Sequence, residues 1–206
     1  MNKEIYDYLS SLFPNPKSEL NYNKDYEFLI AVMLSAQCTD KRVNMVTKEL
    51  FTKYPSLESL ANAPLEDIKT ITKPCGFSIK ATNTIGIAKE LLKLYGGKVP
   101  NTRKELEKLP GVGHKTASVV LYELYNEPII AVDTHVSRVA IRLGLASKKD
   151  SVLTIEKKLM KKVPKEMVPK MHHLLLLFGR YYCKAINPKC TTCKLKDICR
   201  EKRKSI

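Results

Sequence analysis

Apolar residues recur at the spacing of α-helices along almost the whole of this 206-residue chain, and the alternation typical of strands is nearly absent. Prolines and glycines interrupt the pattern at short intervals. We therefore expect an all-α protein of about eleven short helices joined by short turns. The expected helices cover 2–12, 25–37, 40–53, 56–63, 65–72, 78–95, 102–109, 114–125, 134–143, 151–163 and 168–183. Segment 25–37 is apolar almost all round, so it should be central and buried.

The charge of the chain indicates a polyanionic partner. Lys and Arg number 36 against 21 Asp and Glu, a formal net charge of +15, and nine basic residues against two acidic ones lie between Arg180 and Ile206. Solvated lysine-rich helix faces would account for net charge alone, but clustering favours phosphate. The 44% apolar content excludes a disordered basic tail. Without a membrane span or a secretory leader, we expect a cytoplasmic, nucleoid-associated monomer.

A glycine turn between two expected helices contains the sequence Leu-Pro-Gly-Val-Gly-His-Lys at 109–115. It is either an ordinary helical hairpin or an anion site, because its second helix begins with unpaired amides and a positive dipole end. Lys115 favours the anion site, and the segment resembles the helix-hairpin-helix motif that grips DNA backbone. Lys115 is then one more phosphate contact or an amine nucleophile, which would have to be desolvated to lose its proton.

A carboxylate, Asp133, stands where the apolar segment 129–132 leads into the next expected helix. It is expected to cap that helix. One oxygen can do so while the other accepts a proton or stabilises positive charge on a reacting sugar. His135, His172 and His173 are interpreted as core or surface histidines.

Four cysteines near the C-terminus are spaced Cys183-x6-Cys190-x2-Cys193-x5-Cys199. In a cytoplasmic chain this pattern indicates a metal centre rather than disulfides. A zinc ribbon normally has two C-x2-C pairs, and only one gap here has two residues. The spacing therefore favours a [4Fe–4S] cluster that stiffens a basic loop. Cys38 and Cys75 lie elsewhere and are interpreted as buried or half-buried thiols.

Taken together, the hairpin, Lys115, the Val-Asp-Thr-His segment and the cysteine spacing resemble the endonuclease III family of DNA glycosylases, from about Asn21 to Arg200. The resemblance implies a two-lobed all-α fold. A six-helix barrel would cover 22–131, and a cluster domain would combine 1–21 with 132–206. It also implies Lys115 as the Schiff-base nucleophile, Asp133 as the catalytic carboxylate and a cleft that receives a flipped base.

Two further segments match this family. Leu34-Ser-Ala-Gln-Cys-Thr-Asp40 is similar to a stretch whose glutamine fills the gap left by the flipped nucleotide, a role that falls to Gln37. The family's apolar wedge follows a glycine in a Gly-Leu/Phe-Tyr-x-x-Lys-Ala loop. Here the segment Gly-Phe-Ser-Ile-Lys-Ala at 76–81 is one residue shorter and lacks the tyrosine. Phe77 is the first wedge candidate and Ile79 the second.

The expected function is a bifunctional glycosylase and abasic-site lyase that removes oxidised pyrimidines from double-stranded DNA. The residues expected to contact DNA are Gln37, Phe77, Ile79, Gly111, Val112, Gly113, His114, Lys189 and Lys194. One alternative is a mismatch-specific monofunctional glycosylase, although such relatives have Ser or Tyr where Lys115 stands. The other is a non-catalytic iron–sulfur DNA-binding protein, which would need neither Lys115 nor Asp133.

Overall fold

The computed structural model describes residues 3–201, and these contain helices, turns and loops but no strand. The all-α expectation is therefore confirmed. The α-helices of the described residues are α1 (Lys3–Leu12), α2 (Asp25–Leu34), α3 (Asp40–Lys53), α4 (Leu57–Ala61), α5 (Leu65–Thr72), α6 (Ile79–Tyr95), α7 (Arg103–Leu106), α8 (His114–Tyr125), α9 (Thr134–Arg142), α10 (Val152–Lys162) and α11 (Val168–Leu177). Short 3-10 turns cover Lys73–Cys75 and Lys165–Met167, and a π-helical turn covers Phe178–Tyr182.

The chain forms two compact units. Unit 1 combines 1–17 with 126–206, so it is built from both ends of the chain, and unit 2 is 18–125. The division expected from the sequence, 22–131 against the remainder, has slightly different bounds. None of the helices in the described residues is long and apolar enough to cross a membrane.

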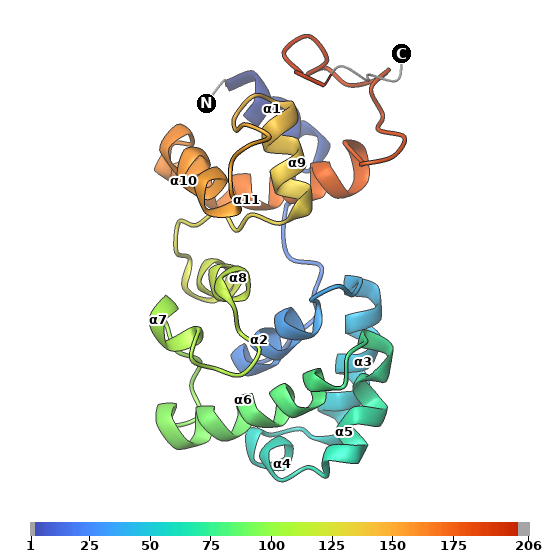
Figure 1. Cartoon of the computed structure of the whole chain (residues 1–206), viewed down its shortest axis with the longest axis vertical. Coiled ribbons are helices and arrows are strands. Elements are labelled where there is room, and N and C mark those ends of the chain that lie inside the picture. The colour runs from blue at the N-terminus through green and yellow to red at the C-terminus, as the bar shows by residue number, and fades with distance from the viewer. Residues whose placement is uncertain (1–2, 202–206) are drawn as a thin grey trace. The chain divides into compact units, whose positions relative to one another are not determined.

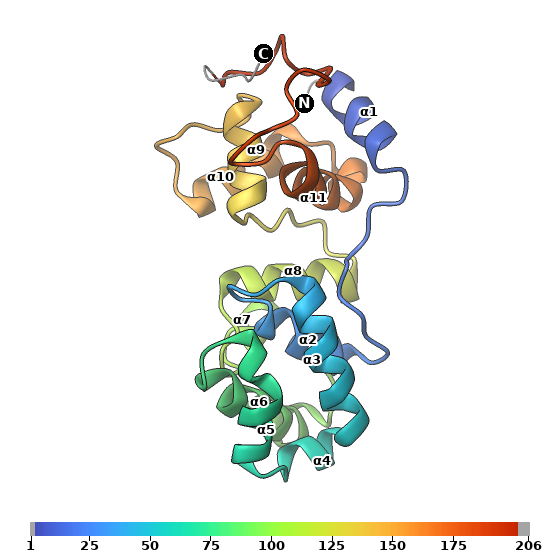
Figure 2. The ribbon, with the colours of Figure 1, turned by 90° about the vertical axis from the view of Figure 1, so that its right-hand side faces the viewer.

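Unit 2 is built around α2, as its apolar sequence predicts. Every residue of α2 after Asp25 is buried. Helices α3, α6 and α8 pack against α2, and α6 also contacts α4 and α5 (Figures 1 and 2). Burial of these apolar faces is the main stabilising contribution to the unit. Its largest fully buried side chains include Phe28, Leu29, Leu50, Ile87 and Leu106.

Unit 1 has its own apolar core. Helix α11 packs against α1 and α9, and α9 contacts α10 (Figure 1). Tyr8 of α1 meets the rings of Phe178 and Tyr182 edge-on, with both centroids 6.3 Å away. Helix α1 therefore packs against the π-helical turn that precedes the first of the C-terminal cysteines.

Several helix ends differ from the sequence expectation by a few residues, and two of them lie beside candidate site residues. Helix α2 ends at Leu34 instead of 37, because Gln37 adopts a positive φ of 56° that no α-helix accommodates. The helix expected over 168–183 is α-helical only to Leu177 and finishes as the π-helical turn that precedes Cys183. Such π-helical turns occur frequently at functional sites.

Candidate functional site

The glycine turn between α7 and α8 is packed onto α6 of the same unit. A Cβ at Gly86 would lie 2.9 Å from the Cγ of Pro110, so the ring of Pro110 sits directly on the helix backbone. Gly111 has a φ of +73°, a conformation that favours glycine. A Cβ at Gly111 would overlap the side chain of Asn83. The turn therefore requires glycine at position 111 for both conformation and packing.

The next two residues of the turn face opposite ways. The side chain of Val112 is buried, whereas a Cβ at Gly113 would meet no atom within 4 Å. Gly113 immediately precedes α8, whose first-turn amides have no acceptor inside the helix. An open glycine beside such amides allows an anion to approach the backbone closely.

Lys115 lies in the first turn of α8 and is exposed. Unit 2 by itself therefore does not provide the desolvated setting that a neutral amine needs. A ligand that binds against this surface would have to exclude the water.

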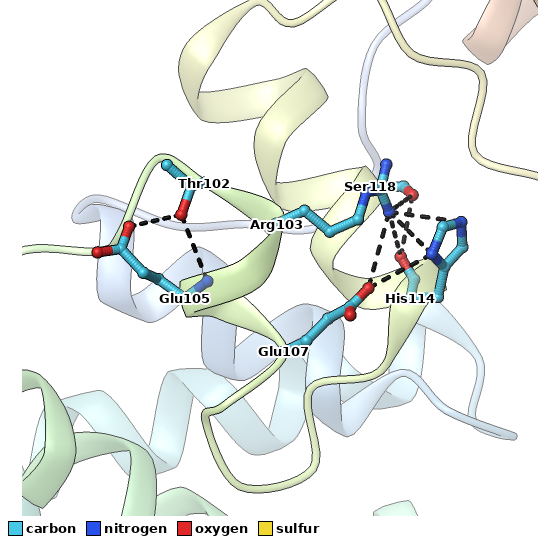
Figure 3. Close-up of polar contacts among 6 residues, drawn as sticks. All are labelled: Thr102, Arg103, Glu105, Glu107, His114 and Ser118. Atoms are coloured by element: carbon cyan, nitrogen blue, oxygen red, sulfur yellow. Dashed lines mark hydrogen bonds and ion pairs between the residues drawn. The ribbon is translucent and has the colours of Figure 1, made fainter.

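The side chain of His114 is held in a polar cluster between α7 and α8 (Figure 3). Arg103 Nη1 lies 3.1 Å from His114 Nδ1 and donates to the carbonyl oxygen of His114 at 3.2 Å and to Ser118 Oγ at 2.8 Å. Glu107 Oε1 lies 3.3 Å from the same ring nitrogen, His114 Nδ1. This cluster joins the two helices of the hairpin next to Lys115, so it fixes the helix turn from which that lysine projects.

The start of α7 also follows its sequence signal. Thr102 caps the helix, its hydroxyl accepting from the Glu105 amide at 3.3 Å. The Thr102 hydroxyl in turn donates to Glu105 Oε2 at 2.5 Å (Figure 3).

The three residues expected to insert into a duplex lie on two loops of unit 2. Gln37 is exposed in the turn between α2 and α3. Phe77 is 64% exposed and Ile79 58% exposed, at the start of α6. Both side chains are large, apolar and exposed, and they are only two positions apart. They are therefore available to a partner.

Asp133 begins α9 in unit 1. Its Oδ1 accepts a hydrogen bond from the Val136 amide at 2.8 Å, which confirms the expected capping role. Its Oδ2 makes no hydrogen bond within residues 3–201 and remains available for chemistry. Lys115 belongs to unit 2 and Asp133 to unit 1, so each is positioned here only within its own unit.

The four C-terminal cysteines line one open pocket in unit 1. Its other lining residues include Phe178, Tyr182 and Leu195. Burial raises the pKa of the Cys193 thiol, and charge on each of the other three thiols would raise it further. Cys193 therefore interacts electrostatically with each of the other three cysteines.

Among the described residues, no three His, Cys, Asp or Glu side chains are arranged to hold a single metal ion. A cubane cluster makes a different demand, because each of its four irons is bound by a separate thiolate and the ligands surround a cavity. Four thiols line one pocket with an apolar lining, which is the kind of arrangement that a [4Fe–4S] cluster requires.

Two arginines of α9 bond to the first of these cysteines. Arg138 donates to the Cys183 carbonyl at 3.0 Å and to the Gly179 carbonyl at 2.6 Å. Arg142 donates to Cys183 Sγ at 3.3 Å and to the Lys184 carbonyl at 2.8 Å. Burial raises the pKa of the Cys183 thiol, and the Arg142 hydrogen bond opposes that shift. The two arginines therefore connect the helix that begins at Asp133 to the cysteine loop.

The two lysines expected to contact DNA from this loop, Lys189 and Lys194, are both exposed. The ammonium of Lys189 lies 5.5 Å from the centre of the Tyr182 ring, a cation–π distance. The sequence analysis did not single out Arg103, Arg138, Arg142 or the buried Lys80. Only the spacing of Arg138 and Arg142, four residues apart on one helix, was a usable signal.

A profile described as "HhH-GPD superfamily base excision DNA repair protein" matches residues 30–165. The endonuclease III of Bacillus subtilis (strain 168) is 49% identical over 199 residues, covering 96% of this chain and 91% of that protein. The endonuclease III of Escherichia coli (strain K12) is 43% identical over 209 residues, covering 99% of both chains.

Solved structures agree with this similarity. A non-covalent endonuclease III–DNA complex superposes with a TM-score of 0.93 at 46% identity, covering 97% of this chain and 94% of that one. A trapped endonuclease III–DNA covalent intermediate gives a TM-score of 0.92 at the same identity and coverage. The chain therefore belongs to the endonuclease III family of the HhH-GPD superfamily of base excision DNA repair proteins.

Proposed function

We propose that Lys115 and Asp133 carry out the DNA glycosylase and abasic-site lyase activity of this chain, and that oxidised pyrimidines in double-stranded DNA are its substrates. The observation that carries the assignment is the position of Lys115. It is the exposed amine in the first turn of α8, directly after an open glycine turn, in a chain of the endonuclease III family.

Lys115 Nζ attacks C1′ of the damaged nucleoside, and the bond from C1′ to the base breaks with its electron pair leaving on the base. The nitrogen then loses one proton, and the C1′–O4′ bond breaks with its electron pair going to O4′, which takes up a proton. This step leaves a protonated imine between Nζ and C1′. The imine acidifies the C2′ proton, whose removal expels the 3′ phosphate and breaks the strand. Bound DNA supplies the desolvation that the exposed amine lacks in the free chain.

Asp133 stabilises the positive charge that develops on the deoxyribose ring and accepts a proton as the amine attacks. The position of Asp133 as the N-cap of α9 supports this role. The Val136 amide holds Oδ1 in place at the start of α9, while Oδ2 stays available. A carboxylate held on a helix end needs little reorganisation during the reaction.

Substrate binding combines backbone contacts with base extrusion. The open backbone at Gly113 and the amides of the α8 first turn, with Gly111, Val112 and His114, would bind a phosphate. The exposed Lys189 and Lys194 would contact the backbone from unit 1. Extruding a damaged base costs less free energy than extruding an intact one, because a damaged base stacks and pairs poorly. Gln37, Phe77 and Ile79 would occupy the space that it leaves.

The cofactor is a [4Fe–4S] cluster held by Cys183, Cys190, Cys193 and Cys199. The open pocket that these thiols line and their mutual proximity support it. When bound, the cluster supplies a rigid covalent framework for the basic loop that carries Lys189 and Lys194. Arg142 stabilises the thiolate form of Cys183 by donating to its sulfur.

Replacing Cys193 with alanine should remove the cluster, because one iron loses its protein ligand. Protein purified without oxygen should contain about four irons per chain as wild type and far less as Cys193→Ala. Iron analysis and visible absorption check this. Cys38→Ala is the matched control, since Cys38 lies in unit 2 outside the pocket, and it should keep its iron. Equal iron loss in both variants would contradict the assignment.

The glycine turn offers a paired test of packing against ligand access. Gly111→Ala should lower the free energy of unfolding by about 3 kcal/mol, because it adds positive-φ strain to overlap with Asn83. Gly113→Ala should cost about 1 kcal/mol or less, because its Cβ meets open space. Thermal unfolding measures both.

On abasic-site duplex, however, Gly113→Ala should bind roughly tenfold more weakly, because the methyl group keeps the phosphate from the amides. Binding equal to that of the wild type would remove the hairpin from the DNA interface.

The proposed function is tested by incubating the purified protein with an abasic-site duplex and a thymine-glycol duplex in the presence of borohydride. A covalent complex on both duplexes is expected, since borohydride reduces the imine to a stable amine. A complex on the abasic duplex alone would support the lyase chemistry and contradict the oxidised-pyrimidine substrate. No complex on either duplex, with the cluster intact, would favour a monofunctional or non-catalytic protein.

A further inference from the structure

Lys80 is a buried lysine whose charge is not used by the chemistry described above. It lies in the first turn of α6 with only 5% of its surface exposed. Its Nζ donates to three backbone carbonyls, those of Leu34 at 2.9 Å, Ala36 at 2.6 Å and Cys75 at 2.7 Å. Within residues 3–201 it forms no ion pair with a carboxylate. Burying an ammonium is costly, so all three of its N–H groups must be satisfied, and here they are.

The three carbonyls come from chain segments that end at the same place. Leu34 is the last residue of α2, and Cys75 is the last residue of the 3-10 turn Lys73–Cys75. Carbonyls at helix ends lack intrahelical partners and carry partial negative charge. The ammonium therefore joins two helix ends and the turn after α2 through one atom.

Each of these segments leads directly into a predicted duplex-inserting residue. Ala36 precedes Gln37, whose positive φ turns the chain sharply. Cys75 precedes Gly76, at a φ of 94°, and then the exposed Phe77.

We propose that Lys80 is a positioning residue that holds the Gln37 loop and the Phe77 loop in a fixed register, so that both enter the duplex together when a base is extruded. The proposal rests on the proposed insertion of Gln37 and Phe77. Hydrogen bonds to one ammonium would hold the shortened wedge loop against the glutamine loop before DNA binds. The entropy lost in ordering both loops on the duplex would then be smaller.

The test compares excision of thymine glycol from a duplex with excision from the single strand of the same sequence, because only the duplex demands extrusion. Lys80→Met removes the ammonium and keeps the length of the side chain. We expect it to lower the duplex-to-single-strand rate ratio at least tenfold. Lys89→Met, the same change at an exposed site of α6, should leave the ratio unchanged. Equal loss on both substrates would mean a merely structural role and would overturn the proposal.

Coupling provides a second readout. If Lys80 acts through the loops, adding Lys80→Met to a Gln37→Ala, Phe77→Ala background should lower the ratio less than twofold further. A full additional tenfold loss, or no effect of the loop variants themselves, would also overturn the proposal. Fluorescence of a 2-aminopurine placed beside the lesion reports extrusion directly and should fall in Lys80→Met.

If Lys80→Met does not fold, the same ratio is measured on Lys80→Arg. This variant keeps the charge, but its planar donors cannot point at three carbonyls around one atom. A ratio about threefold below wild type is expected, and an unchanged ratio would overturn the proposal. Failure of the proposed function is seen separately, as absence of borohydride trapping by the wild-type protein.

Discussion

Lys115→Ala is expected to lose covalent trapping on abasic DNA and to cleave the strand at least about 10³-fold more slowly than wild type. Alanine has no amine with which to form the imine, and no other step of the proposed reaction can replace it. The fold should be unaffected, since Lys115 is exposed and alanine favours helices. Binding of the damaged duplex should fall only by the loss of one cationic contact. A denaturing gel after borohydride treatment measures the trapping.

Lys89→Ala is the control for this variant, because it removes an equally exposed lysine and the same charge from unit 2. It should trap DNA as efficiently as the wild type. If Lys115→Ala still cleaved abasic DNA at the rate of Lys89→Ala, another amine would have to be the nucleophile.

Asp133→Asn is expected to slow base excision by about 10²–10⁴-fold while changing the free energy of unfolding by less than about 0.5 kcal/mol. Asparagine caps helices as well as aspartate does, so its side-chain oxygen can still accept from the Val136 amide. Only the negative charge is lost. Single-turnover excision of thymine glycol and thermal unfolding, measured on one preparation, separate the two effects.

Asp133→Ala completes the comparison, because it loses the cap as well as the charge. It should excise as slowly as Asp133→Asn and in addition be about 1 kcal/mol less stable. An Asp133→Asn protein with wild-type excision would show that the carboxylate is only a helix cap.

Most of the fold could be predicted from the sequence, because its helices are short and punctuated by residues with strong local preferences. Thr102 caps α7 and Asp133 caps α9 as their sequence positions predict. Helix α2, apolar on all sides, is buried as expected. Capping signals of this kind act within one turn of helix, so a single sequence is enough to predict where the helix begins.

The differences arise where tertiary contacts override local preference. Residues 35–37 would continue a helix by propensity, yet Lys80 binds the carbonyls at its end and the chain turns at Gln37. Nothing in the sequence shows that Lys80 is buried, because lysine is normally a surface residue. The polar cluster around Arg103 and His114 also needs two helices to meet, and spacing along the chain does not reveal that.

The surroundings of Lys115 could not be predicted from the sequence either. Chemistry requires a neutral amine, but the chain by itself leaves the side chain in water. A sequence can suggest a nucleophile, such as the proposed Lys115, more readily than it can show when that residue becomes reactive, which in this proposal depends on bound DNA.

Asp133 caps the start of helix α9, and the same helix carries two arginines that donate hydrogen bonds to the carbonyl oxygen and the sulfur of Cys183. The cysteine loop and the proposed catalytic carboxylate are therefore connected through one helix. With the proposed cluster as the occupant of that loop, iron supply would govern repair capacity independently of how much polypeptide is made.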